Sequence, residues 1–144
     1  MAPQFTLSTS LNVNVVTPRG QITEIETNAV TAPGELGEFE ILPGHIPFLT
    51  SLHPGVMIIG EGEEASVYAV SRGYLRVDRS GAVEVLVERV VAGQDVDVKT
   101  ATEERDEARA ALDEWKLKPQ DAEWKNLKDR FEWAQARLDA QTRA

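Results

Sequence analysis

Residues 34–55 read GELGEFEILPGHIPFLTSLHPG, and this stretch decides the fold. Four glycines and three prolines are set among large apolar residues, although turn-forming residues usually lie in polar segments. They divide the apolar run into two short pieces, Phe39–Leu42 and Ile46–Leu49. Pro43-Gly44 suits a type II turn, because proline presets φ and the following glycine tolerates a positive φ. The stretch therefore predicts sharp corners in a β structure.

Short strand patterns continue on both sides of this stretch. Leu11, Val13 and Val15 alternate with Asn12 and Asn14, which is the period-two pattern of a half-buried strand. In residues 21–31 the phase of the apolar positions slips, which predicts a bulge or a change of face. Several short strands separated by regular turn signals indicate a sandwich or a barrel. We predict a β-sandwich over residues 1–93.

The charge pattern changes near residue 94. Residues 1–96 carry a net charge of −7 with few charges, whereas residues 97–144 carry −2 with many charges of both signs. Apolar residues now recur at helical spacing in two narrow stripes. The first stripe is Val98, Ala101, Arg105, Ala108, Leu112 and Trp115, in which the charged Arg105 interrupts the apolar pattern. The second is Trp124, Leu127, Phe131, Ala134 and Leu138.

These stripes predict an antiparallel two-helix hairpin over residues 94–144. Asp97 or Thr100 can cap the first helix, Lys118-Pro119 must end it, and Pro119 can begin the second. The fold class is then α+β, an N-terminal β-sandwich followed by the hairpin. Such a hairpin is marginal alone and must lean on the sandwich, on a partner, or on each in turn. Trp133 lies off the second stripe, and is either a surface aromatic without a task or a docking contact.

Composition excludes several classes of function. The chain has no cysteine and two histidines, so we expect no metal cluster. The sequence contains no phosphate-binding loop and no nucleophile elbow, and we expect neither catalytic residues nor a cofactor. The acidic balance argues against nucleic acid as a partner, and the absence of an apolar run of about 18 residues argues against direct membrane insertion.

The segment from Gly37 to Thr50, GEFEILPGHIPFLT, followed by Leu52 and Pro54-Gly55, resembles the motif of the epsilon subunit of rotary ATP synthase. The stretches SRGYLRV at 71–77 and GQDVD at 93–97 match the family in the same order. The order of sandwich and hairpin also agrees. The Pro-Gly-His sequence and the lack of a transit-peptide pattern favour a bacterial or plastid form.

The resemblance implies a non-catalytic rotor subunit of the central stalk. Its sandwich would bind the gamma subunit and the polar loops of the c ring, and rotate with them, so that proton flow is coupled to ATP synthesis. Glu38 and His45 fall at the family's c-ring contact, although by themselves they read as a solvated carboxylate and a turn histidine. The hairpin would alternate between a compact state and an extended state that blocks ATP hydrolysis in the alpha/beta catalytic head.

The resemblance also implies a location, and a nucleotide site that this sequence lacks in part. The subunit would be peripheral on the cytoplasmic face of a bacterial inner membrane, or on the stromal side of a plastid thylakoid. Some bacterial members bind ATP through an [I/L]-D-x-x-R-A motif, of which Asp97 is kept while Thr100 replaces the arginine. A second copy of the spacing at residues 106–110 begins nine residues later, which is a rotation of about 180° around the helix axis, so it faces the opposite way and we expect weak ATP binding or none. The alternative function is a free-standing β-sandwich adaptor whose hairpin binds another protein.

Overall fold

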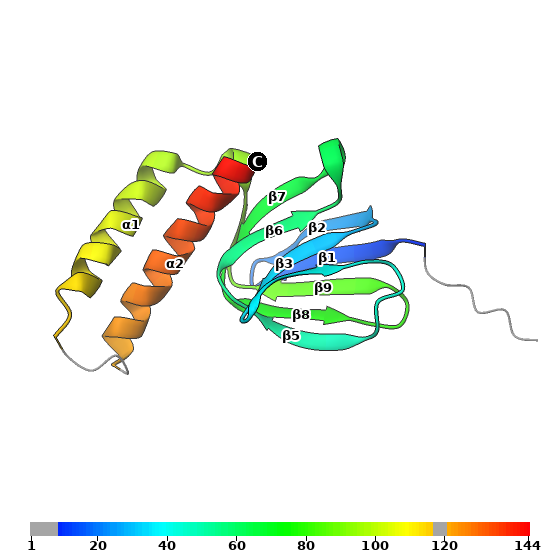
Figure 1. Cartoon of the computed structure of the whole chain (residues 1–144), viewed down its shortest axis with the longest axis horizontal. Coiled ribbons are helices and arrows are strands. Elements are labelled where there is room, and N and C mark those ends of the chain that lie inside the picture. The colour runs from blue at the N-terminus through cyan, green and yellow to red at the C-terminus, as the bar shows by residue number, and fades with distance from the viewer. Residues whose placement is uncertain (1–8, 117–120) are drawn as a thin grey trace, which may run out of the picture.

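In the computed structural model the described residues are 9–116 and 121–144, and they form a β-sandwich with a helical hairpin against one side (Figure 1). The predicted α+β fold is therefore confirmed. The strands are β1 Leu11–Thr17, β2 Gly20–Thr27, β3 Val30–Gly34, β4 Gly37–Ile41, β5 Phe48–Leu52, β6 Gly55–Ile59, β7 Ser66–Val70, β8 Gly73–Val77, β9 Ala82–Val87 and β10 Val90–Ala92. The helices are α1 Val98–Asp113 and α2 Ala122–Arg143, with single 3-10 turns at Gly62–Glu64 and Gly93–Asp95.

The ten strands form one sheet in the order β10-β7-β6-β3-β5-β8-β9-β1-β2, with β4 paired to β3. All pairs are antiparallel except β1 with β9, which brings the first strand beside the ninth. Between β3 and β5 the ladder consists of a single pair, Gly34 with Leu52. The sheet is nearly interrupted there, which lets it fold over into the sandwich.

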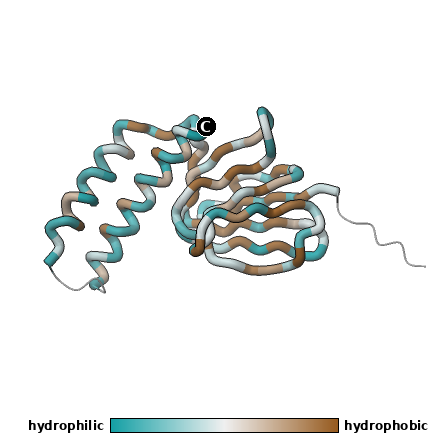
Figure 2. Tube along the Cα trace, in the orientation of Figure 1, coloured by the Kyte–Doolittle hydropathy of each residue, from teal (hydrophilic) through white to brown (hydrophobic). Residues whose placement is uncertain are grey.

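The sandwich core is built from alternating positions of facing strands. Leu11, Val13 and Val15 of β1 are fully buried, as the alternation predicts. Val13 and Val15 pair with Val83 and Val85 of β9, so β-branched side chains fill one layer. Burial of each such side chain stabilises the fold by about 1.5–3 kcal/mol relative to exposure. Figure 2 shows that apolar residues are concentrated in the strands and that few lie on the helices.

The phase slip in residues 21–31 has two causes. Val15 pairs with Thr23 and Val16 pairs with Gln21, so Ile22 bulges out of the ladder and is exposed. A new strand, β3, then begins at Val30 with a buried side chain. The predicted bulge is confirmed.

The hairpin is held to the sandwich by α2, while α1 packs against α2 (Figure 1). Ala101 and Ala108 of the predicted stripe are buried. Val98 is exposed, so its assignment to the stripe is wrong: it is the first residue of α1 and precedes the first buried position at Ala101. The predicted junction at Lys118-Pro119 lies outside the described residues, and the described part of α2 begins at Ala122.

A second apolar cluster joins α2 to the sandwich. Trp133 is 8% exposed and packs with Ala136 and Ala140 against Val56 and Ala69. Trp133 is therefore a docking contact, and its interpretation as a surface aromatic without a task is wrong. The alanines allow the helix backbone to approach the strands closely.

Gly93 begins the 3-10 turn between β10 and α1 and lies against the end of α2. A Cβ on this residue would lie 2.5 Å from the carbonyl oxygen of Ala140. We expect Gly93→Ala to push the last turns of α2 away from the sandwich while the sandwich stays folded. Amide hydrogen exchange should show lost protection in α2 with unchanged protection in β1 and β9.

A matched substitution separates docking from folding. At Gly73 a Cβ would lie 2.0 Å from the carbonyl oxygen of Leu86, inside the sandwich. Gly73→Ala should therefore reduce protection in β8 and β9. Full protection of α2 in Gly93→Ala would show that this close approach does not hold the helix.

Candidate functional site

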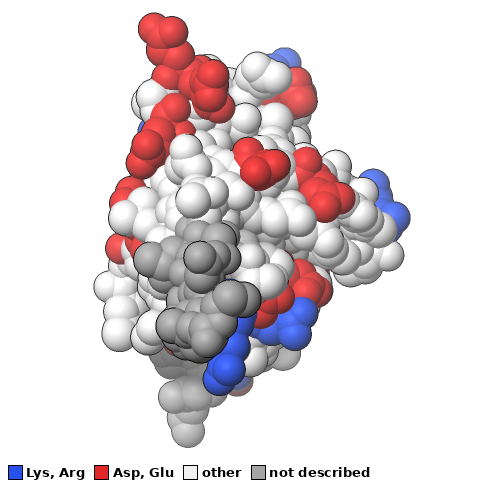
Figure 3. All heavy atoms as spheres, turned by 90° about the vertical axis from the view of Figure 1, so that its right-hand side faces the viewer, with Lys and Arg blue, Asp and Glu red and all other residues white. Residues whose placement is uncertain are grey.

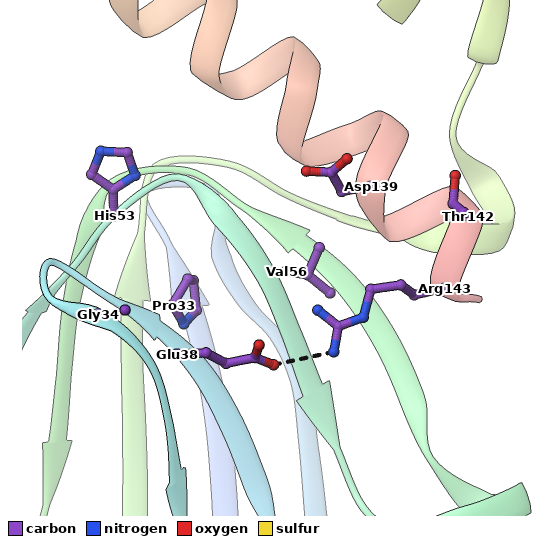
Figure 4. A pocket seen from close by; sticks show the side chains of 9 residues that line it. Pro33, Gly34, Glu38, His53, Val56, Asp139, Thr142 and Arg143 are labelled. Atoms are coloured by element: carbon purple, nitrogen blue, oxygen red, sulfur yellow. Dashed lines mark hydrogen bonds and ion pairs between the residues drawn. The ribbon is translucent and has the colours of Figure 1, made fainter.

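Glu38, a predicted c-ring contact, lies near the β3–β4 turn and faces the hairpin. It is the second residue of β4 and pairs across the ladder with Pro33. Its carboxylate accepts a hydrogen bond from the guanidinium of Arg143 at 3.1 Å, in the last turn of α2 (Figure 4). The residue is more than a solvated carboxylate, because it joins the sandwich to the hairpin.

His45, the other predicted contact, lies in the turn that follows the far end of β4. The backbone N–H of His45 donates to the carbonyl of Leu42 at 3.1 Å, and Gly44 has a φ of +86°. This is the type II turn predicted for Pro43-Gly44. The His45 ring lies 4.8 Å from that of Phe48, and its Nδ1 is 2.8 Å from the Ile46 carbonyl oxygen.

The structure does not bring the two predicted contacts together. Glu38 is beside the turn at one end of β4, and His45 follows Ile41 at the other end. A surface that includes both must extend along the length of β4.

An apolar patch on the outer face of the sandwich was missed by sequence reasoning. Leu49, Tyr74 and Leu86 are 67%, 58% and 41% exposed. Leu49 lies on β5, Tyr74 on β8 and Leu86 on β9, which are neighbours in the sheet, and Tyr74 pairs directly with Leu86, so the patch crosses three strands. A signal existed in the sequence, since Leu86 is apolar where the alternation of β9 calls for a polar residue.

Glu132 is the centre of the charged contacts between α2 and the sandwich. Its side chain is only 13% exposed. The Oε2 atom is 3.3 Å from Nε2 of His53 and 3.5 Å from the guanidinium of Arg72, and Oε1 is 3.8 Å from Nζ of Lys128. A carboxylate with little access to water is costly unless it is paired, so its two partners on the sandwich, His53 and Arg72, favour one docked position of α2, while Lys128 lies on α2 itself.

Two arginine guanidinium groups lie over the ring of the docked Trp133. The guanidinium of Arg89, from the sandwich, lies 5.0 Å from the Trp133 ring, and that of Arg137 lies 5.3 Å from it. Arg137 also bonds to Glu104 of α1, which ties the two helices together. The docking surface is thus a small apolar centre surrounded by charged groups.

The residues of the incomplete nucleotide motif make local contacts. Asp97 caps α1, and its carboxylate accepts a hydrogen bond from the backbone N–H of Thr100 at 3.1 Å. The pKa of Asp97 is lowered below its ordinary value of 3.8. The bond from the Thr100 N–H is the largest cause, and a hydrogen bond from the Thr100 hydroxyl is the next. In the second copy, the Arg109 guanidinium lies 5.3 Å from the Phe131 ring and Asp106 pairs with Arg105. Weak or absent ATP binding remains our prediction.

Among the described residues, no cluster of three or more histidine and carboxylate side chains is arranged to hold a metal ion. None of the described helices has the length and apolar character needed to cross a membrane.

The cap at Asp97 gives a pH-dependent prediction. Because the pKa of Asp97 is lowered in the folded protein, the stabilisation is complete above about pH 3.8 and is lost as the pH falls through the lower folded value. Asp97→Asn should keep the cap and remove this pH dependence, whereas Asp97→Ala should expose the Thr100 amide to exchange at every pH. Asp106→Ala is the control, and equal exchange at Thr100 in all variants would contradict the role.

The ATP prediction has a direct test. Isothermal titration of the full chain with ATP should show no binding at micromolar concentrations, because Thr100 supplies no positive charge for phosphate. Thr100→Arg tests whether the missing arginine is the cause. Micromolar affinity in the unaltered chain would contradict the prediction.

Comparison with known proteins gives consistent matches. Residues 10–93 match the family model described as ATP synthase, delta/epsilon chain, beta-sandwich domain. The ATP synthase epsilon chain of Magnetococcus marinus is 37% identical over 134 residues, which cover 93% of this chain and 96% of the relative. The ATP synthase epsilon chain of Geobacter metallireducens is 37% identical over 132 residues, which cover 92% and 94%.

Solved structures share the fold. A chain in the cryo-EM structure of the Euglena gracilis mitochondrial ATP synthase, OSCP/F1/c-ring, matches with a TM-score of 0.80 and 21% identity, covering 99% of this chain and 87% of that one. A chain in the central stalk/c-ring structure of the Tetrahymena thermophila mitochondrial ATP synthase matches with a TM-score of 0.57 and 17% identity, covering 96% and 100%.

Proposed function

Because this chain belongs to the ATP synthase epsilon-chain family, we propose that it works as a rotor subunit of the central stalk. It is a non-catalytic subunit of the membrane-bound ATP synthase. In this proposal it couples proton-driven rotation of the c ring to ATP synthesis and inhibits ATP hydrolysis through its C-terminal helices. Its place is on the cytoplasmic face of a bacterial inner membrane, or the stromal side of a thylakoid.

One observation carries the proposal of a movable hairpin. α2 contacts the sandwich through one tryptophan and two small residues, surrounded by ion pairs, and α1 packs against α2. Interfaces with a small apolar centre and charged surroundings favour reversible docking, in the manner of elements that switch between two packings. Released from the sandwich, the hairpin would be free to reach the alpha/beta catalytic head.

The sandwich offers surfaces for the two other proposed partners. We assign the apolar patch of Leu49, Tyr74 and Leu86 to the gamma subunit, because exposed apolar patches mark protein interaction sites. We assign Glu38 and His45 to the polar loops of the c ring, along the length of β4. The exposed side chain of Ile46, beside His45, adds apolar area at that end.

Inhibition of ATP hydrolysis by the hairpin is tested with a substitution in the sandwich, so that the hairpin sequence stays intact. Arg72→Ala removes a partner of Glu132 and of Asp129. Loss of these partly exposed ion pairs lowers the free energy of docking by about 1 kcal/mol or less. The ratio of docked to released hairpin then falls by up to about fivefold. Added to a head complex that contains gamma but lacks this subunit, Arg72→Ala should inhibit ATP hydrolysis more strongly than the unaltered chain.

Two controls separate inhibition by the hairpin from other causes of a changed rate of ATP hydrolysis. Arg79→Ala changes an exposed arginine in the β8–β9 turn and should leave inhibition unchanged. Deletion of residues 97–144 should abolish inhibition while binding to gamma persists. If the full chain neither binds gamma nor changes the rate, the rotor proposal is wrong and the adaptor alternative gains.

A further inference from the structure

The ion pair between Glu38 and Arg143 joins the proposed ring contact to the hairpin. The two residues are 105 positions apart in sequence, and their atoms Oε1 and Nη2 lie 3.1 Å apart. Figure 4 shows the Arg143 side chain extending from the end of α2 toward the carboxylate on β4. Both side chains are roughly half exposed, so the pair can be broken from outside.

We propose that docking of the hairpin and the ring contact at Glu38 oppose each other, because both use the same carboxylate. The inference rests on the proposed function, in which Glu38 faces the polar loops of the c ring. In the docked state Arg143 neutralises Glu38. A ring loop that binds through the charge of Glu38 competes with the guanidinium for it, because Arg143 already neutralises that charge in the docked state.

The opposition acts in both directions. If a docked hairpin weakens the ring contact, the ring contact weakens docking by the same factor, because the two equilibria are linked. Engagement with the ring would then bias the hairpin toward release. For one exposed ion pair we expect a coupling of roughly two- to fivefold, and a smaller one at high salt.

His45 provides an internal reference. It lies beyond the opposite end of β4, and within the described part of the chain its contacts are with Leu42, Ile46 and Phe48. Loss of His45 should weaken ring binding without changing how the hairpin affects it. The coupling between hairpin docking and ring binding is therefore assigned to Glu38 alone, and not to the whole surface that contacts the ring.

The test is a double-mutant cycle on ring binding. Full-length variants are titrated onto an assembly of c ring and gamma in lipid nanodiscs, and the dissociation constant is measured at low and high salt. Arg143→Ala should bind roughly two- to fivefold more tightly than the unaltered chain, and Glu38→Gln should bind more weakly. The double variant should bind like Glu38→Gln, because Arg143 acts through Glu38. Arg143→Lys keeps the charge and should stay near the unaltered chain.

The outcomes separate this inference from the function beneath it. If Glu38→Gln weakens binding but Arg143→Ala does not strengthen it, the coupling is wrong and the rotor function stands. If Arg143→Ala strengthens binding equally in the Glu38→Gln background, the effect arises from hairpin release alone and the coupling is also wrong. If the unaltered chain does not bind the assembly, both proposals fail. The same cycle with His45→Ala in place of Glu38→Gln should keep the full effect of Arg143→Ala.

Discussion

The structure depends on how α2 covers two different surfaces at once. One face packs on α1, and the opposite face carries Trp133 and Glu132 to the sandwich. A buried tryptophan contributes a large apolar area, but the ion pairs around Glu132 contribute little beyond offsetting the loss of hydration. The docking contact is therefore specific in geometry and modest in free energy, which is the balance that a two-state element requires.

Local features of the fold could be predicted from the sequence, because the residues that determine them are neighbours. The alternation of Leu11, Val13 and Val15, the type II turn at Pro43-Gly44 and the cap at Asp97 are each set within a few residues. The pairing of β1 with β9 and the order of the sheet are not visible in this way. They depend on contacts between segments about 70 residues apart, and periodicity gives no information on which strand a given strand pairs with.

The candidate site was less predictable for the same reason. Arg72 and Glu132 are 60 positions apart, and Glu38 and Arg143 are 105 positions apart. Read locally, each is one more charged residue on an exposed face. The position of Trp133 off the apolar stripe was the one local sign that α2 has a second partner, and only the tertiary structure shows that this partner is the sandwich.

The separation of Glu38 from His45 gives the sandwich two distinct ends. A packed β-sandwich is stiff, so a change at the end that carries Glu38 need not alter the turn that holds His45. A contact that spans both ends can keep its hold through His45 while the charge on Glu38 is exchanged between partners. Such an arrangement would let the hairpin change state without releasing the sandwich from the rotor. Ring attachment and hairpin docking share only the Glu38 carboxylate, and the rest of the ring contact does not depend on the hairpin.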